Sequence, residues 1–223
     1  MKGIKEYINE SIQLNESGKI KVKDGKELKA LIHDRIAERG YTCDLNDIDV
    51  SNVKDLSYLF SSNGEFSNFN GDISKWDVSH VEDMEGMFAG SFFNGDISKW
   101  DVRHVEDMSS MFADSHFRKD ISKWDVSSVK NMSSMFEGSV FNGDISKWDV
   151  SNVEDMSYMF KNSKFSRNLS RWDVSNVKYM ALMFKNSNFA GDISGWDVSN
   201  VEDMSNMFTN STLVGNEPEW YRA

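Results

Sequence analysis

His80 and His104 are the residues whose type and spacing come closest to a catalytic or metal-binding pattern, since they occupy equivalent places in two successive repeats. If the repeats stack, the two imidazoles would lie about 5 Å apart and could share a metal ion. Zinc needs further ligands, but the sequence supplies no third ligand at this position, and Arg103 adjoins the pair. We therefore expect no metal site here.

Acidic residues recur with the same spacing and would form a ladder of carboxylates on stacked repeats. The ladder consists of Asp49, Asp77, Asp101, Asp125, Asp149, Asp173 and Asp197. A basic ladder runs beside it through Lys75, Lys99, Lys123, Lys147 and Arg171, and is broken at Gly195. Calcium requires roughly six to eight oxygens around one ion, which the interleaved cations oppose. The only cysteine, Cys43, has no evident activating base and is expected to be inert. The sequence thus predicts no catalytic residues and no cofactor.

The elements that carry these ladders are copies of one unit of 24 residues. Seven tryptophans mark it: Trp76, Trp100, Trp124, Trp148, Trp172, Trp196 and Trp220. A fixed period of this size is the signature of a solenoid, in which each unit buries its apolar face on its neighbours. We expect a degenerate first coil over 41–68, six regular coils over 69–212 and a truncated coil over 213–223. No unit carries the long insertion in which a solenoid enzyme builds its pocket.

Two periodicities occur within each unit. Apolar and polar residues alternate around Trp76, which predicts a short strand with the indole facing inward. Val81, Met84, Met87 and Phe88 follow at helical spacing, which predicts a short helical or 3₁₀ turn with both methionines in the core. The fold class predicted is therefore an α/β repeat solenoid.

Residues 1–40 lack the repeat and are predicted to form a helical cap or docking segment. Leu28, Leu31, Ile32 and Ile36 share one face of a helix over 26–38, with Asp24 as the N-cap and Gly40 after its end. Residues 19–23 alternate lysine with apolar residues, as in an edge strand. Residues 1–16 include a second amphipathic pattern, which would either pack as part of the cap or hold a partner in an assembly. At the other end, Pro218 is expected to stop further stacking.

The apolar spacing Ile73-x-x-Trp76-x-Val78-x-x-Val81, continued by Met-x-x-Met-Phe, resembles the BspA-like leucine-rich repeats of bacterial surface proteins and lipoproteins, in the subgroup first noted in mycoplasma surface proteins. The resemblance covers about residues 41–220. It implies leucine-rich-repeat coils and a non-enzymatic role in adhesion or protein binding, often at the cell surface.

Charge narrows the possible partners. The net charge is −11, and the repeat region after residue 40 carries all of the acidic excess, so a nucleic-acid partner is not expected. No apolar run approaches the roughly 18 residues of a membrane-spanning helix. The first residues do not read as a secretory signal, so as given the chain would be cytoplasmic or associated with a virion.

Two surfaces are candidate binding sites. The Lys/Asp ladders form the candidate ligand face for a protein or glycan; alternatively, the opposite charges pair with one another and the face is merely solvated. A candidate partner patch consists of Tyr158, Lys161, Lys178 and Leu182, at positions that vary between units. The resulting prediction is a protein-interaction or adhesion module of bacterial or phage origin. The alternative is a structural component of a virion or surface assembly, docked through the N-terminal helix.

Overall fold

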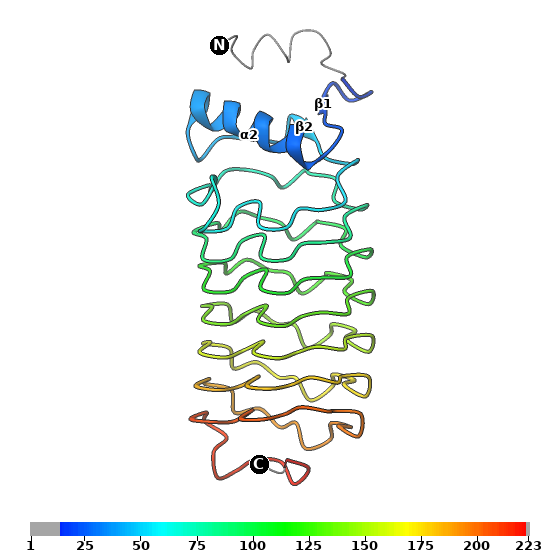
Figure 1. Cartoon of the computed structure of the whole chain (residues 1–223), viewed down its shortest axis with the longest axis vertical. Helices are drawn as coiled ribbons and strands as arrows, with labels where there is room; N and C mark the ends of the chain where they lie inside the picture. Colours follow the sequence, from blue (N-terminus) through cyan, green and yellow to red (C-terminus); the bar gives the residue numbers. More distant parts are fainter. Residues whose placement is uncertain (1–13, 222–223) are drawn as a thin grey trace.

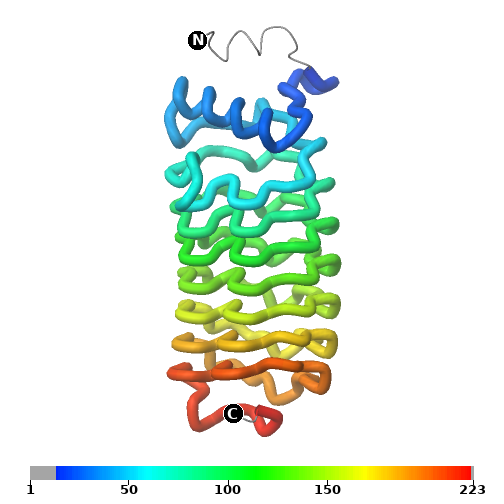
Figure 2. Tube along the Cα trace, viewed as in Figure 1, coloured from blue at the N-terminus to red at the C-terminus, as the bar shows by residue number. Residues whose placement is uncertain are grey.

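The repeated units form successive coils stacked along one axis, as Figures 1 and 2 show. This computed structural model describes residues 14–221. Parallel bridges join each coil to the next at equivalent residues, from Asp55 to Asp83, from Asp83 to Asp107, and onward to Asp203. The first step spans 28 residues and the later ones span 24, which matches the sequence period. The chain is therefore a repeat protein in which one sequence unit makes one coil.

The core is built from the same side chains in every coil. Met84, Met87 and Phe88 are fully buried, and Trp76 is 4% exposed. Phenylalanine rings stack in columns along the axis, with centroids 5.8 Å apart for Phe60 and Phe88. The prediction that the tryptophans and methionines face inward is confirmed.

The limb that carries the tryptophan is not a strand, which contradicts the sequence-based prediction. Turns at Ser74–Lys75 and Ser79–His80 flank Trp76, and no strand occurs in the described part of the repeats after β2. The turns leave no backbone ladder in this limb, and the indole links it to the preceding coil instead. Each indole Nε1–H donates to a backbone carbonyl of the preceding coil across 2.9–3.1 Å. The donors are Trp76, Trp100, Trp124, Trp148, Trp172, Trp196 and Trp220, and the acceptors, in the same order, are Leu45, Ile73, Ile97, Ile121, Ile145, Leu169 and Ile193.

The limb that carries the methionines holds the backbone ladder between coils. Its helical spacing is real, because Met87 N–H donates to Met84 O at 3.2 Å, but Gly86 has a φ of +55° and the turn does not continue as a helix. The amides of Met84, Gly86, Phe88 and Gly90 instead donate to carbonyls of the next coil at 2.7–3.0 Å. The predicted helical turn is therefore wrong: this limb is a run of tight turns whose alternate amides point along the stack.

The N-terminal end is covered by a short strand and one helix. The strand β1 (Ile20–Lys21) pairs in parallel with β2 (Ile48–Asp49), and α2 (Gly25–Arg39) then crosses the first coil (Figure 1). Asp24 caps α2 by accepting from Glu27 N–H, and Gly40 ends it. Leu28, Leu31 and Ile32 are buried beneath it, so the predicted helix and its caps are confirmed.

Other predictions about the ends have different outcomes. The segment predicted as an edge strand over 19–23 contains β1, which is only two residues long. Residues 1–13, most of the predicted docking helix, lie outside the described residues. At the C-terminal end, Trp220 stacks on Trp196 at 6.3 Å, and Pro218 opens a turn closed by Tyr221 N–H at 2.9 Å.

The indole ladder can be tested by Trp124→Phe, which keeps an aromatic ring but leaves the buried Ile97 carbonyl without its donor. We expect a loss of about 1–3 kcal/mol in the free energy of unfolding, measured by urea denaturation. Trp220→Phe is the matched control, because its ring is only partly buried and it lies at the end of the stack. Equal, small losses in both variants would show that the indole bond contributes little.

Candidate interaction surfaces

The aspartates of the candidate ligand face stabilise turns rather than pair with the lysines. Asp77 Oδ1 accepts from the backbone N–H of Ser79 at 3.1 Å and from its hydroxyl at 2.6 Å, and Asp125, Asp149 and Asp173 repeat the arrangement. These bonds hold the pKa of Asp125 and of Asp173 below the usual value, as the side chain of Arg103 does for Asp101.

The basic ladder of this face is unpaired. Among the described residues, none forms an ion pair with Lys75, Lys99, Lys123, Lys147 or Arg171. All five side chains are exposed. The alternative that the two ladders neutralise one another is therefore wrong, because the aspartates are directed into their own turns. The lysines form a free basic row beside a row of turn-forming carboxylates.

Three ion pairs between coils lie elsewhere, at the residue that follows the second valine of a unit. Lys54 contacts Glu82 at 2.6 Å, Lys130 contacts Glu106 at 2.7 Å, and Lys178 contacts Glu154 at 2.6 Å. Sequence reasoning missed these pairs, although the signal was present as an exchange of lysine and glutamate at one repeat position. Lys178, assigned to the candidate partner patch, is thus held by Glu154.

His80 and His104 line a small depression of about 260 Å³ together with Lys54, Glu82 and Glu106. His104 Nδ1 lies 2.7 Å from Ser79 O, and three asparagines at the equivalent position donate to the corresponding carbonyls at 2.6–2.7 Å. Within residues 14–221, no group of three or more metal-ligating side chains is positioned to hold an ion. His104 therefore acts as a substitute for the asparagine that ties neighbouring coils.

The candidate partner patch contains two residues in an unusual backbone conformation. Tyr158 and Leu182 have φ values of +62° and +59°, in the left-handed region that Gly86 and Asn206 occupy at the same repeat position. The two coils meet here, since Tyr158 N–H donates to Ala181 O at 2.9 Å. Lys161 lies over the Tyr158 ring at 5.0 Å from its centroid and also pairs with Glu137 at 2.8 Å.

A second tyrosine adjoins this patch and was missed from the sequence. Tyr179 is 41% exposed and replaces the aspartate that bridges most coils, between Asp155 and Asp203. Its hydroxyl donates to Glu202 at 3.3 Å. The signal was the loss of aspartate from an otherwise polar column. We call Tyr158, Lys161, Tyr179 and Leu182 the tyrosine patch.

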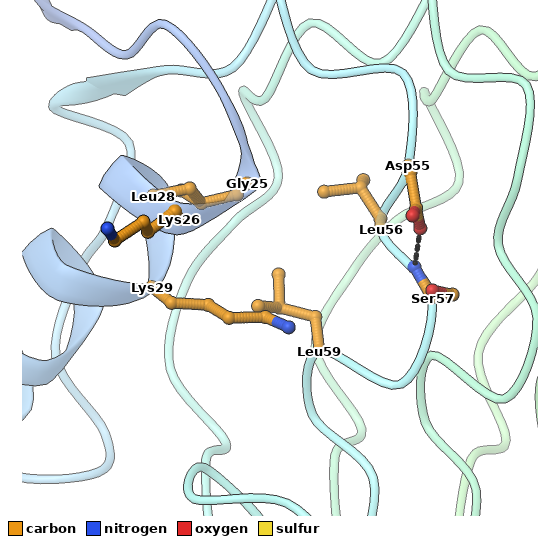
Figure 3. Close-up of a pocket in the computed structure, with 8 residues that line it drawn as sticks. All are labelled: Gly25, Lys26, Leu28, Lys29, Asp55, Leu56, Ser57 and Leu59. Atoms are coloured by element: carbon orange, nitrogen blue, oxygen red, sulfur yellow. Dashed lines mark hydrogen bonds between the residues drawn. The ribbon is translucent and has the colours of Figure 1, made fainter.

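A groove of about 420 Å³ separates the first turn of α2 from the first coil (Figure 3). Leu28 and Lys29 line one side, and Asp55, Leu56 and Leu59 line the other. Cys43 lies elsewhere in the same end of the stack and is buried, which raises the pKa of its thiol. A protonated, enclosed thiol is a poor nucleophile. Neither feature assembles a group of side chains suited to catalysis.

The comparisons with known proteins give one match. The family model described as "Mycoplasma protein of unknown function, DUF285" matches residues 31–139 and again residues 113–220. No curated protein and no solved structure matches the chain. In the described part of the chain, α2 is too short and too polar to cross a bilayer, and no other helix qualifies.

Asp83 offers a pH-dependent test of the stack. Burial, together with the charges of Asp55, Asp107 and Glu85, raises its pKa, so its ionisation weakens the fold. Asn131 occupies the same column and donates to Asp107 at 2.9 Å. Asp83→Asn should therefore stabilise the protein by about 0.5–1 kcal/mol at pH 7, measured by thermal unfolding.

The gain from Asp83→Asn should disappear as the pH falls through the raised pKa and below the unfolded value, because the wild-type carboxyl is then protonated as well. Asp192→Asn is the control. Bonds from Ser194 lower the pKa of Asp192, so its replacement should bring no gain at pH 7. An unchanged advantage of Asp83→Asn at low pH would contradict the electrostatic explanation.

Proposed function

We propose that this chain, which belongs to the family described as Mycoplasma protein of unknown function, DUF285, is a non-enzymatic protein-binding or adhesion module. We assign its coils to the BspA-like leucine-rich repeats and the stack that they form to the solenoid class. The stacked 24-residue coils and the Ile-x-x-Trp-x-Val spacing support this assignment. The coils supply a rigid, regular frame, and binding depends on the surface positions at which the units differ.

The observation that carries the proposal is the backbone conformation of Tyr158 and Leu182. A left-handed conformation costs a residue with a side chain roughly 1–2 kcal/mol, and bulky residues are rarely found there. Tyr58 occupies this position in the first coil, and the remaining units place glycine, serine or asparagine there, so the fold itself does not need tyrosine or leucine. Strained bulky side chains in two neighbouring coils support a functional contact at this place.

The chemistry of the tyrosine patch suits a protein partner. Tyrosine combines a large apolar ring with a polar hydroxyl, and such side chains dominate the binding energy of protein interfaces. The ammonium of Lys161 lies against the Tyr158 ring, and its charge is matched by Glu137. We assign the patch to a partner surface that presents apolar groups.

Two other assignments have less support. The unpaired lysines of the candidate ligand face would suit an acidic glycan, but none of them is strained or enclosed. A structural role docked through residues 1–16 is the alternative function. It depends mainly on residues 1–13, which lie outside the described part of the chain.

The backbone strain at the tyrosine patch is tested by Leu182→Asn. This change introduces asparagine, the residue that occupies the same repeat position at Asn206. Relief of backbone strain should raise the free energy of unfolding by about 1 kcal/mol, measured by urea denaturation. Tyr58→Ser applies the same principle in the first coil, where the tyrosine hydroxyl donates to Glu85. A marked loss of stability on Leu182→Asn would mean that Leu182 is required for packing and would remove the basis of the proposal.

Binding is tested with the double variant Tyr158→Ser/Leu182→Asn. Immobilised wild-type chain and variant are compared for direct binding of each protein that the wild type captures from its native source. The double variant should lose at least about thirtyfold in affinity for the true partner, the equivalent of one hot-spot contact. Tyr58→Ser should bind as the wild type does. Equal affinity of all three chains would rule out the tyrosine patch as the binding site.

A further inference from the structure

The methionine limb leaves a row of unpaired donors at the C-terminal end of the stack. In the preceding coil, the amides of Met180, Leu182, Phe184 and Asn186 donate to Asp203, Ser205, Met207 and Thr209 at 2.8–3.0 Å. The equivalent amides of the last coil belong to Met204, Asn206, Phe208 and Asn210. Within residues 14–221 these four amides find no acceptor. The edge therefore offers four donors spaced along one limb, beside one acceptor, the carbonyl of Glu202, whose equivalent Lys178 O accepts from the amides of Glu202 and Asp203.

Apolar side chains beside this edge are also incompletely covered. Val198, Val201 and Met204 are only partly buried, whereas their equivalents in the preceding coil, Val174, Val177 and Met180, are at most 1% exposed. Within residues 14–221, the final unit covers the tryptophan side through Leu213 and Trp220, and Tyr221 contacts the ring of Phe208 with centroids 4.9 Å apart. The described residues leave open the place above Val201 and Met204 of the last coil, which we call the terminal slot.

Charge at the terminal slot is also unmatched. Glu202 occupies the column in which Glu106 and Glu154 pair with Lys130 and Lys178 of the following coil. Among the described residues Glu202 forms no ion pair, and its contact is the hydroxyl of Tyr179. A basic group one coil further on would complete the column.

We propose that the terminal slot binds an extended segment of another polypeptide that covers this open place. The segment supplies backbone carbonyls to Met204, Asn206, Phe208 and Asn210, a basic side chain to Glu202, and apolar side chains to Val201 and Met204. Addition of a segment to an open edge is an established form of peptide recognition. Here the edge is rich in donors, because four of its free backbone groups are amides and only one, the carbonyl of Glu202, is an acceptor.

This excess of donors opposes the simplest self-association. Two copies meeting through their terminal slots would bring four free amides against four, with only the Glu202 carbonyl of each copy to accept from them. A copy stacking its first coil on the last coil of another would meet the final unit, which already occupies the tryptophan side, and would bring α2 into the contact. The occupant is therefore a separate extended segment rather than the whole face of a second copy.

The chain itself provides two matched probes. A peptide of residues 129–139 has the sequence VKNMSSMFEGS and places Lys130 opposite Glu202, whereas a peptide of residues 105–115, VEDMSSMFADS, places Glu106 there. Added to full-length labelled protein, the lysine peptide should bind at least about tenfold more tightly than the glutamate peptide, measured by fluorescence polarisation. Binding of neither peptide, or equal binding of both, would overturn the proposal.

Glu202→Lys should reverse the preference between the two peptides by a similar factor. Glu65→Lys makes the same charge change at the opposite end of the stack and should leave the preference as in the wild type. In NMR spectra of labelled protein, the amide protons of Met204, Asn206, Phe208 and Asn210 should shift downfield on addition of the lysine peptide. An unreversed preference, or shifts confined to other coils, would place the peptide elsewhere and overturn the proposal.

The terminal slot adjoins the tyrosine patch, because Tyr179 donates to Glu202, but Tyr158 and Leu182 do not form part of the slot. Tyr158→Ser/Leu182→Asn should bind the lysine peptide with the wild-type affinity, because Glu202 and the last coil are unchanged. Loss of peptide binding in that variant would show that the segment occupies the tyrosine patch and would reject the slot.

Discussion

The stack depends on the bond from each indole N–H to a carbonyl of the preceding coil. On the tryptophan side the backbone turns too tightly to form a ladder, so side chains must supply the links between coils. Tryptophan combines a large buried surface with a single donor, which makes it both core residue and tie. Because the acceptor lies in the neighbouring coil, the bond requires each unit to have nearly the same length and shape. This requirement accounts for a sequence period without insertions after the first coil.

The opposite side of each coil follows a different rule. Alternate amides of the methionine limb close turns within the coil, and the others donate toward the C-terminal end. Positive φ values at two places in each coil after the first make this possible, since they turn the chain out of a helix while keeping the core side chains inward. The two ends of the stack are consequently unlike. One end is covered by α2 and β1, and the other presents unpaired donors.

Because the coils are nearly identical, a residue that differs from its equivalents in the other coils is informative. Asparagine, serine or glycine occupies these surface positions in other coils, so the fold does not require a tyrosine, leucine or phenylalanine there. Phe92, for example, is 58% exposed and lies against His116 at 4.8 Å. The tyrosine patch differs from it because its backbone is also strained, at Tyr158 and Leu182. Tyr58 shares this conformation in the first coil, but only the tyrosine patch combines two such residues in neighbouring coils.

The sequence by itself determined the repeat, the side chains of the core, and the helix from Gly25 to Arg39 with its caps, because each of these depends on spacing within a few residues or on the period. It also located the variable position of Tyr158 and Leu182. It did not determine which limb forms the ladder, the left-handed conformation at that position, or the pairing of Lys130 with Glu106 and of Lys178 with Glu154. Those features depend on the direction of backbone groups and on contacts with the next coil. Side-chain periodicity shows which residues face inward, but the tertiary structure alone decides where the amides and carbonyls point.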